Sequence, residues 1–128
     1  SITYEDYMVA DSYPEDGGAD EYFALDASMG KKLLVLRFHL TNETEQEETI
    51  DLLNTNSRYI ITVNDSVRAN ALTTMLPNDM STYAETLEPG QTQELVLLLE
   101  INEDVAGAVQ TIALRLKNAS NEYTIQLL

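Results

Sequence analysis

The sequence contains no cysteine, no tryptophan and a single histidine, His39. Without cysteine the chain forms no disulfide and performs no thiol chemistry. Structural zinc sites usually take three or four His or Cys ligands, and the chain offers one such residue. Acyl transfer needs a base beside a nucleophile, and no G-x-S-x-G motif, P-loop or G-x-G-x-x-G fingerprint is present. We therefore expect a protein that is not an enzyme, with no cofactor, and His39 as a surface residue of a strand.

Long hydrophobic runs and positive charge are also lacking. The longest apolar run has five residues, whereas a membrane helix needs about 20, so we expect no direct membrane insertion. The chain has 7 Lys and Arg against 22 Asp and Glu, a net charge of −15. Nucleic acid binding depends on basic residues that neutralise phosphates, so the sequence excludes nucleic acid as a partner.

The acidic residues are concentrated at the N-terminus, where no base precedes Lys31. Residues 1–21 are predicted to form an acidic strand and loop segment. Four side chains there surround a Gly-Gly pair and are candidate calcium ligands: Asp11, Glu15, Asp16 and Asp20. Their spacing is not that of an EF-hand loop. We expect a solvated acidic loop without a metal, and calcium is the alternative.

The clearest strand pattern is KKLLVLRFHLTN, residues 31–42. One parity of this segment is apolar and is predicted to face the core: Leu34, Leu36, Phe38 and Leu40. The other parity contains Val35, Arg37 and His39, which we expect on the outer face. A hydrophobic strand with one polar face is typical of a half-buried sheet.

The segment LEPGQTQELVLLLEI, residues 87–101, departs from this pattern because residues 95–99 are all apolar. A strand with both parities apolar is covered on both faces. We predict that a loop or the N-terminal segment covers its outer face. The alternative is an exposed apolar face that binds a partner.

Further short strands are predicted at 49–53, 58–64, 67–72, 109–117 and 122–128, the last two as a hairpin. Residues 71–85 indicate a loop with one turn of helix, and residues 103–107 a compact turn. Seven to eight short strands with turns between them favour an all-β fold, an antiparallel sandwich with little helix. At 128 residues the chain is predicted to form one domain, residues 1–128.

Two segments carry a resemblance to a known family. KKLLVLRFHLTNETEQEE, preceded by Gly30 and containing Asn42, resembles the strand and turn of telokin-like immunoglobulin-fold domains in secreted lipoproteins of Gram-positive bacteria. LEPGQTQELVLLLEI is similar to a second segment of that family at Pro89, Gly90 and Glu100, although Leu99 stands where the family commonly has Phe. The resemblance covers roughly residues 22–128 and implies an immunoglobulin-like, extracellular, non-catalytic module. A looser similarity exists to bacterial intracellular proteinase-inhibitor domains.

These observations predict a non-enzymatic extracellular module for binding, adhesion or spacing at a bacterial cell surface. Its partner would be a protein or a component of the cell envelope. The chain starts at Ser1 without an initiator Met or a leader, so we expect any lipid anchor in an upstream segment. The alternative is a proteinase inhibitor that acts through an exposed loop at residues 73–86. An enzyme built on scattered carboxylates is the third hypothesis.

Overall fold

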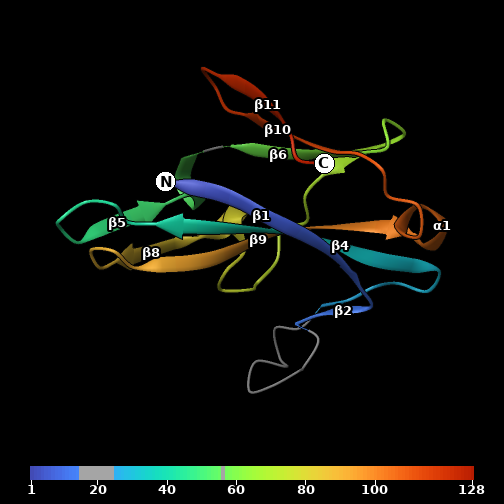
Figure 1. The fold of residues 1–128 in the computed structure, drawn as a ribbon, viewed down its shortest axis with the longest axis horizontal. Coiled ribbons are helices and arrows are strands. Elements are labelled where there is room, and N and C mark those ends of the chain that lie inside the picture. The colour runs from blue at the N-terminus through green and yellow to red at the C-terminus, as the bar shows by residue number, and fades with distance from the viewer. Residues whose placement is uncertain (15–24, 56) are drawn as a thin grey trace.

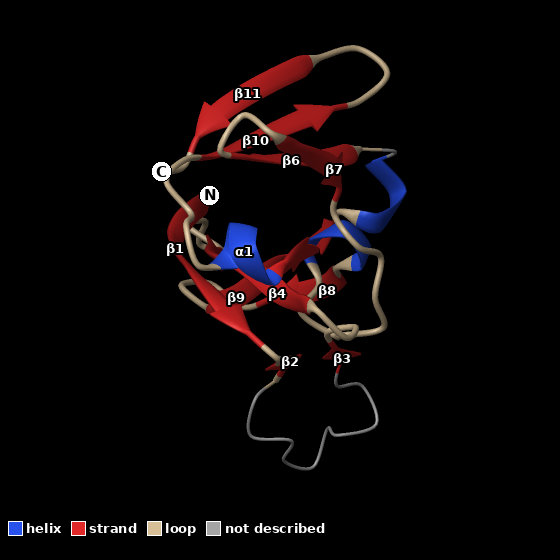
Figure 2. Cartoon of the chain, turned by 90° about the vertical axis from the view of Figure 1, so that its right-hand side faces the viewer, coloured by secondary structure: helices blue, strands red, loops and turns tan. Residues whose placement is uncertain are grey.

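The chain folds into two β-sheets that face each other (Figures 1 and 2). The structure is a computed structural model and describes residues 1–14, 25–55 and 57–128. In the first sheet the strand order is β1-β4-β9: β1 (Ile2–Ala10), β4 (Lys31–Thr41) and β9 (Thr92–Asn102). In the second sheet the order is β11-β10-β6-β7: β11 (Glu122–Gln126), β10 (Ile112–Lys117), β6 (Arg58–Val63) and β7 (Val67–Asn70). The pairs in both sheets are antiparallel, which confirms the predicted immunoglobulin-like antiparallel β-sandwich.

Two small ribbons and three short helical turns complete the described residues. The ribbons pair β5 (Glu48–Asp51) with β8 (Ala84–Leu87), and β2 (Ser12–Tyr13) with β3 (Leu25–Asp26). The helical turns are η2 (Leu53–Thr55), η3 (Met80–Thr82) and α1 (Glu103–Ala106). The sequence did not predict β2, β3 or β8. β2 and β3 have two residues each, and the first three residues of β8 are exposed, so none of them shows an apolar alternation.

The main core lies between the two sheets, as the alternation in residues 31–42 predicts. The inward parity of β4 is at most 4% exposed. It packs in one cluster with Ile61 and Val63 of β6 and with Ile112 and Leu114 of β10. Burial of each such side chain stabilises the fold by about 1.5–3 kcal/mol. The predicted hairpin of the last two strands is also present, as β10 pairs with β11.

The prediction that Val35 lies on an open outer face is wrong, because Val35 is 0% exposed. A second apolar cluster covers this side of the sheet. Its buried members are Leu33, Val35, Leu76, Val96 and Leu98, and the residues packed against them are Met8, Tyr13, Leu25, Ala27 and Leu72. Figure 2 shows β2 and β3 on the side of the first sheet that faces away from the second sheet.

The run of apolar residues 95–99 is therefore covered on both faces, as expected. Both kinds of cover that the sequence allowed are used, because the second cluster takes Tyr13 and Leu25 from the N-terminal region and Leu72 and Leu76 from a later loop. The same loop also occupies the outer edge of β9. There Leu72 donates to the carbonyl of Leu98 (2.8 Å), and Val96 donates to that of Asn78 (2.9 Å).

The cover ends part of the way along the sheet and divides its outer face in two. The covered half contains Val35, Val96 and Leu98. The open half carries polar side chains of the same three strands: Thr3, Glu5, Asp6, Arg37, His39 and Glu94, which are exposed or half-buried. The edge strands of the two sheets are β1 and β9 in the first and β11 and β7 in the second, because each has a neighbouring strand on one side alone among the described residues.

Candidate functional site

Of the four candidate calcium ligands, the structure describes Asp11. Asp11 is exposed and forms an ion pair with Lys32 across the sheet. Glu15, Asp16 and Asp20 lie outside the described residues. The calcium alternative therefore stays a prediction.

A β-bulge in β1 shapes the open half of the outer face. Tyr4 pairs with Phe38 and Asp6 pairs with Arg37, so Glu5 is an extra residue between two regular pairs. In a bulge of this kind two consecutive residues oppose one residue of the partner strand. As a result Glu5 and Asp6, though adjacent in sequence, both reach side chains on the outer face of β4.

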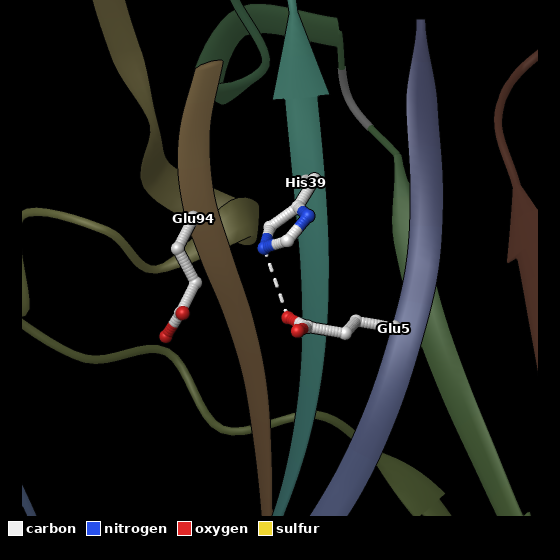
Figure 3. Close-up of side chains that lie close together, drawn as sticks. All are labelled: Glu5, His39 and Glu94. Atoms are coloured by element: carbon white, nitrogen blue, oxygen red, sulfur yellow. Dashed lines mark ion pairs between the residues drawn. The ribbon is translucent and has the colours of Figure 1, made fainter.

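Glu5, His39 and Glu94 form a cluster across the three strands of the first sheet. His39 Nε2 lies 2.9 Å from a carboxylate oxygen of Glu5, and both side chains are about two-fifths exposed. Glu94 of β9 is directly opposite His39 in the register of the sheet. One potential ligand atom from each residue lies within 4.8 Å of the other two. Figure 3 shows His39 in the middle, with one carboxylate on each side.

Beside this cluster, Arg37 is engaged by Asp6. The guanidinium donates through Nε and one terminal nitrogen to the two carboxylate oxygens of Asp6, a bidentate geometry that fixes both groups. These hydrogen bonds lower the pKa of Asp6 below its ordinary value and raise that of Arg37. The pair is close to neutral, and the remaining carboxylates of the open half are those of Glu5 and Glu94.

A cleft between the two sheets is the second candidate site. It has a volume of about 570 Å³, and β1, β4, β6, β10, β11 and the neighbouring turns line it. Its apolar lining includes Ile2, Tyr4, Phe38, Leu116, Ile125 and Leu127. The rings of Tyr4 and Phe38 meet edge to face with their centroids 5.5 Å apart. Among the described residues that line the cleft none is acidic or basic.

The mouth of the cleft lies at the edges of both sheets. Ile2 on β1 is 46% exposed and Ile125 on β11 is 49% exposed. Every residue of β11 is exposed, so this strand extends beyond the packed core. Exposed large apolar side chains beside a cavity are characteristic of a binding surface.

The segment 73–86, predicted as an exposed loop, is only partly exposed. Asp79 is 0% exposed, and its carboxylate accepts hydrogen bonds from the backbone and hydroxyl groups of Thr74 and Ser81 at 2.6–2.9 Å. Leu76, Met80 and Tyr83 are also buried, whereas Met75 is 82% exposed. Asp79 thus fixes the segment from within, and Met75 is its large apolar side chain exposed to solvent.

Sequence reasoning placed His39 correctly on the outer face and did not find Glu5 or Glu94 as its neighbours. One signal for the bulge is present in the strand ITYEDYMVA. Its apolar parity runs through Ile2 and Tyr4 and then changes to Tyr7 and Val9, which requires one extra residue between Tyr4 and Tyr7. No comparable signal identifies Glu94, because its position opposite His39 depends on the register between β4 and β9.

Comparisons with known proteins show the fold. No family model and no curated protein sequence matches the chain. Among solved structures, the chain is similar to an uncharacterized beta-sandwich protein from Clostridium difficile 630, with 16% identity and a TM-score of 0.62 over 99% of this chain and 84% of that one. It is also similar to a conserved hypothetical protein from Bacillus anthracis, with 13% identity and a TM-score of 0.57 over 99% and 86%. Both likenesses support a β-sandwich.

In the part of the chain that the structure describes, no helix has the length and apolar character needed to cross a bilayer.

Proposed function

We propose that this chain is a non-enzymatic, immunoglobulin-like binding module that holds an extended polypeptide segment, apolar and basic in character, in the cleft between β1 and β11. The observation that carries the proposal is the apolar cleft of about 570 Å³ with an edge strand at each side of its mouth. This volume lies within the range of about 300–1,000 Å³ typical of ligand sites.

The edge strands favour a polypeptide over a small molecule. An edge strand has a row of backbone N–H and C=O groups that can pair with an added strand. A peptide that pairs with β1 or β11 gains main-chain hydrogen bonds, and alternate side chains can enter the apolar cleft. Exposed Ile2 and Ile125 are placed to contact the first apolar side chains of such a peptide.

The negative charge of the chain favours a basic partner. A net charge of −15 attracts basic segments and repels acidic ones, which raises the association rate for a cationic partner. The lining itself is apolar, with no acidic or basic group among its described residues. The titratable side chains of the described lining are Tyr4 and Tyr59, and burial raises the pKa of both above the ordinary tyrosine value. This composition supports binding without catalysis, because a general acid or base works best with a pKa near the operating pH.

We place this module at a bacterial cell surface, where the partner is a protein of the envelope or its surroundings. The support is the resemblance of residues 22–128 to domains of secreted lipoproteins. Fractionation of the native host checks the location: the protein should appear in the envelope or the medium. Its recovery in the cytoplasmic fraction alone would contradict this part of the proposal.

Peptide binding can be measured by fluorescence polarisation at about 0.15 M salt, where charges separated by more than about 8 Å are screened. The probe is a ten-residue peptide of alternating Val and Lys, and the control peptide has Ser in place of Val at equal charge. We expect the Val-Lys peptide to bind at least about tenfold more tightly, which corresponds to about 1.4 kcal/mol.

Variants locate the site. Ile125→Asp and Ile2→Asp should each weaken binding of the Val-Lys peptide by about tenfold or more, because each places a charge at the mouth of the cleft. Met29→Asp is the matched control, since Met29 is fully exposed and does not line the cleft. Equal binding of both peptides, or equal binding by the Ile125 variant and the control variant, would refute the proposal.

One observation favours proteinase inhibition as a second function. Met75 is 82% exposed between Thr74, which hydrogen-bonds Asp79, and buried Leu76. A fixed loop with an exposed large apolar residue can enter the specificity pocket of a proteinase without losing much conformational freedom. Residual activity of chymotrypsin and subtilisin in the presence of the protein tests this function. We then expect Met75→Asp, and not Met29→Asp, to abolish inhibition, and full proteinase activity with the wild-type chain would exclude it.

A further inference from the structure

We propose that Glu5, His39 and Glu94 form a binding site for a divalent transition metal of the zinc class. The site lies on the open half of the first sheet, on the opposite face from the cleft. Peptide binding and metal binding therefore use different side chains, and failure of one proposal leaves the other intact. The sequence-based expectation of no zinc site counted His and Cys alone, and carboxylates are also zinc ligands.

The donor set determines the class of metal. One imidazole nitrogen and two carboxylates provide three protein ligands, and sites with three protein ligands complete the coordination of zinc with water. Calcium and magnesium prefer oxygen ligands throughout. The imidazole of His39 therefore favours zinc and related transition metals over the alkaline-earth ions.

The geometry requires only a small adjustment. Zinc binds nitrogen and oxygen ligands at about 2.0–2.2 Å, so ligand atoms in a tetrahedral site are about 3.4 Å apart. The ligand atoms of this cluster lie within 4.8 Å of one another, and His39 and Glu5 are already 2.9 Å apart. The three residues stand on three adjacent paired strands, so the backbone holds them in place. We expect the Glu94 side chain to rotate to close the site.

The charges around the cluster also suit a divalent cation. With a neutral imidazole the two carboxylates carry a charge of −2, and a divalent ion neutralises it. Within the described residues, no ion pair and no hydrogen bond engages the Glu94 carboxylate. The base beside the cluster, Arg37, is already held by Asp6 on two nitrogens.

The bulge in β1 is an independent observation that supports the site. In regular alternation only one of two adjacent residues points to a given face. The extra residue at Glu5 lets both acids face outward, so that Asp6 pairs with Arg37 and Glu5 remains available to His39. Bulges re-aim side chains and are common next to functional sites. Here the bulge separates an ion pair from a potential ligand group.

Calorimetric titration of the full chain with zinc chloride at neutral pH tests the proposal. We expect one zinc ion per chain, with much weaker binding of Mg²⁺ and Ca²⁺. His39→Asn and Glu94→Gln should each weaken zinc binding by at least about tenfold, because even an outer-shell partner is typically worth 10–100-fold in metal affinity. Glu85→Gln is the matched control, since it removes the same charge from an exposed position on β8.

A second readout identifies the ligand atom. His39 is the sole histidine, so a ¹H–¹⁵N spectrum of the imidazole contains one set of ring signals, and zinc should shift its nitrogen resonances at a 1:1 ratio. Circular dichroism confirms that each variant is folded. Equal zinc affinity of the wild type and His39→Asn, or displacement of zinc by an equal concentration of Mg²⁺, would overturn the proposal. Either result would show that cations gather nonspecifically around a chain of net charge −15 and occupy no defined site.

Discussion

The two halves of the outer face of the first sheet are built on the same strands and behave differently. In the covered half, Val35, Val96 and Leu98 are 0% exposed. In the open half, Arg37 and His39 follow on the same face of β4, and both side chains are partly exposed. The boundary falls between Val35 and Arg37, two positions apart. The difference comes from the segments packed on the sheet, because the strands themselves continue through both halves.

One sheet thus combines a doubly buried half with a polar, solvent-accessible half. The covered half excludes water and adds apolar burial to that of the main core. The open half keeps charged groups in water, where the cost of desolvating them is avoided. Strands buried on both faces over part of their length can hold polar side chains in fixed positions over the rest.

The largest expected effect is on the covered half. Leu98→Ala should lower the free energy of unfolding by about 2–5 kcal/mol, as much as Leu36→Ala on the opposite face, because both side chains are 0% exposed. Urea unfolding at neutral pH measures both variants. Met29→Ala, at a fully exposed residue, is the control and should change stability by less than about 0.5 kcal/mol. A similarly small loss for Leu98→Ala would show that the cover opens in solution.

The next effect concerns the loop that forms part of the cover. Asp79→Ala removes the acceptor of four hydrogen bonds from Thr74 and Ser81 and the N-cap of η3. We expect a loss of about 1–3 kcal/mol, since the partly buried donors of Thr74 and Ser81 lose their acceptor. Hydrogen exchange should also become faster at two amides. The amide of Leu72, in the loop, donates to Leu98 of β9, and the amide of Val96, in β9, donates to Asn78 of the loop. Unchanged exchange at both amides would contradict an anchoring role for Asp79.

The smallest effect is on the open half and depends on pH. The hydrogen bonds from Arg37 lower the pKa of Asp6 in the folded state, so the pair stabilises the fold above the unfolded-state pKa of about 3.9 and loses this contribution as the pH falls through the folded-state pKa. Because both side chains are about one-third or more exposed, Asp6→Asn should cost no more than about 1 kcal/mol at pH 7.

The difference between the wild type and Asp6→Asn should shrink as the pH falls below about 4, the unfolded-state pKa of aspartate. Urea unfolding of both proteins across this range measures it, with Glu85→Gln as the control for the loss of one negative charge. A difference that stays constant from pH 7 to pH 2 would show that the Arg37 pair does not contribute to stability.

Much of the fold could be predicted from local patterns. The alternation in residues 31–42 and the apolar run at 95–99 identified β4 and β9 and the need for cover on β9. The same reasoning failed at Val35, because Arg37 and His39 on the same parity indicate an open face, although Leu33 on that parity is apolar. It predicted His39 as a surface residue of the strand, assigned it to no site, and left Glu5 and Glu94 unrecognised.

The sequence by itself determined the period of the strands, the acidic charge and the need to bury residues 95–99, since these depend on the order and type of neighbouring residues. The tertiary structure alone decided which half of the outer face is covered and which residues meet on the other half. The cover comes from Tyr13, Leu25 and the loop around Leu76, and the cluster depends on a bulge in β1 and on the register of β4 with β9. Contacts between segments so distant in the chain depend on how the whole core packs, which no local pattern specifies.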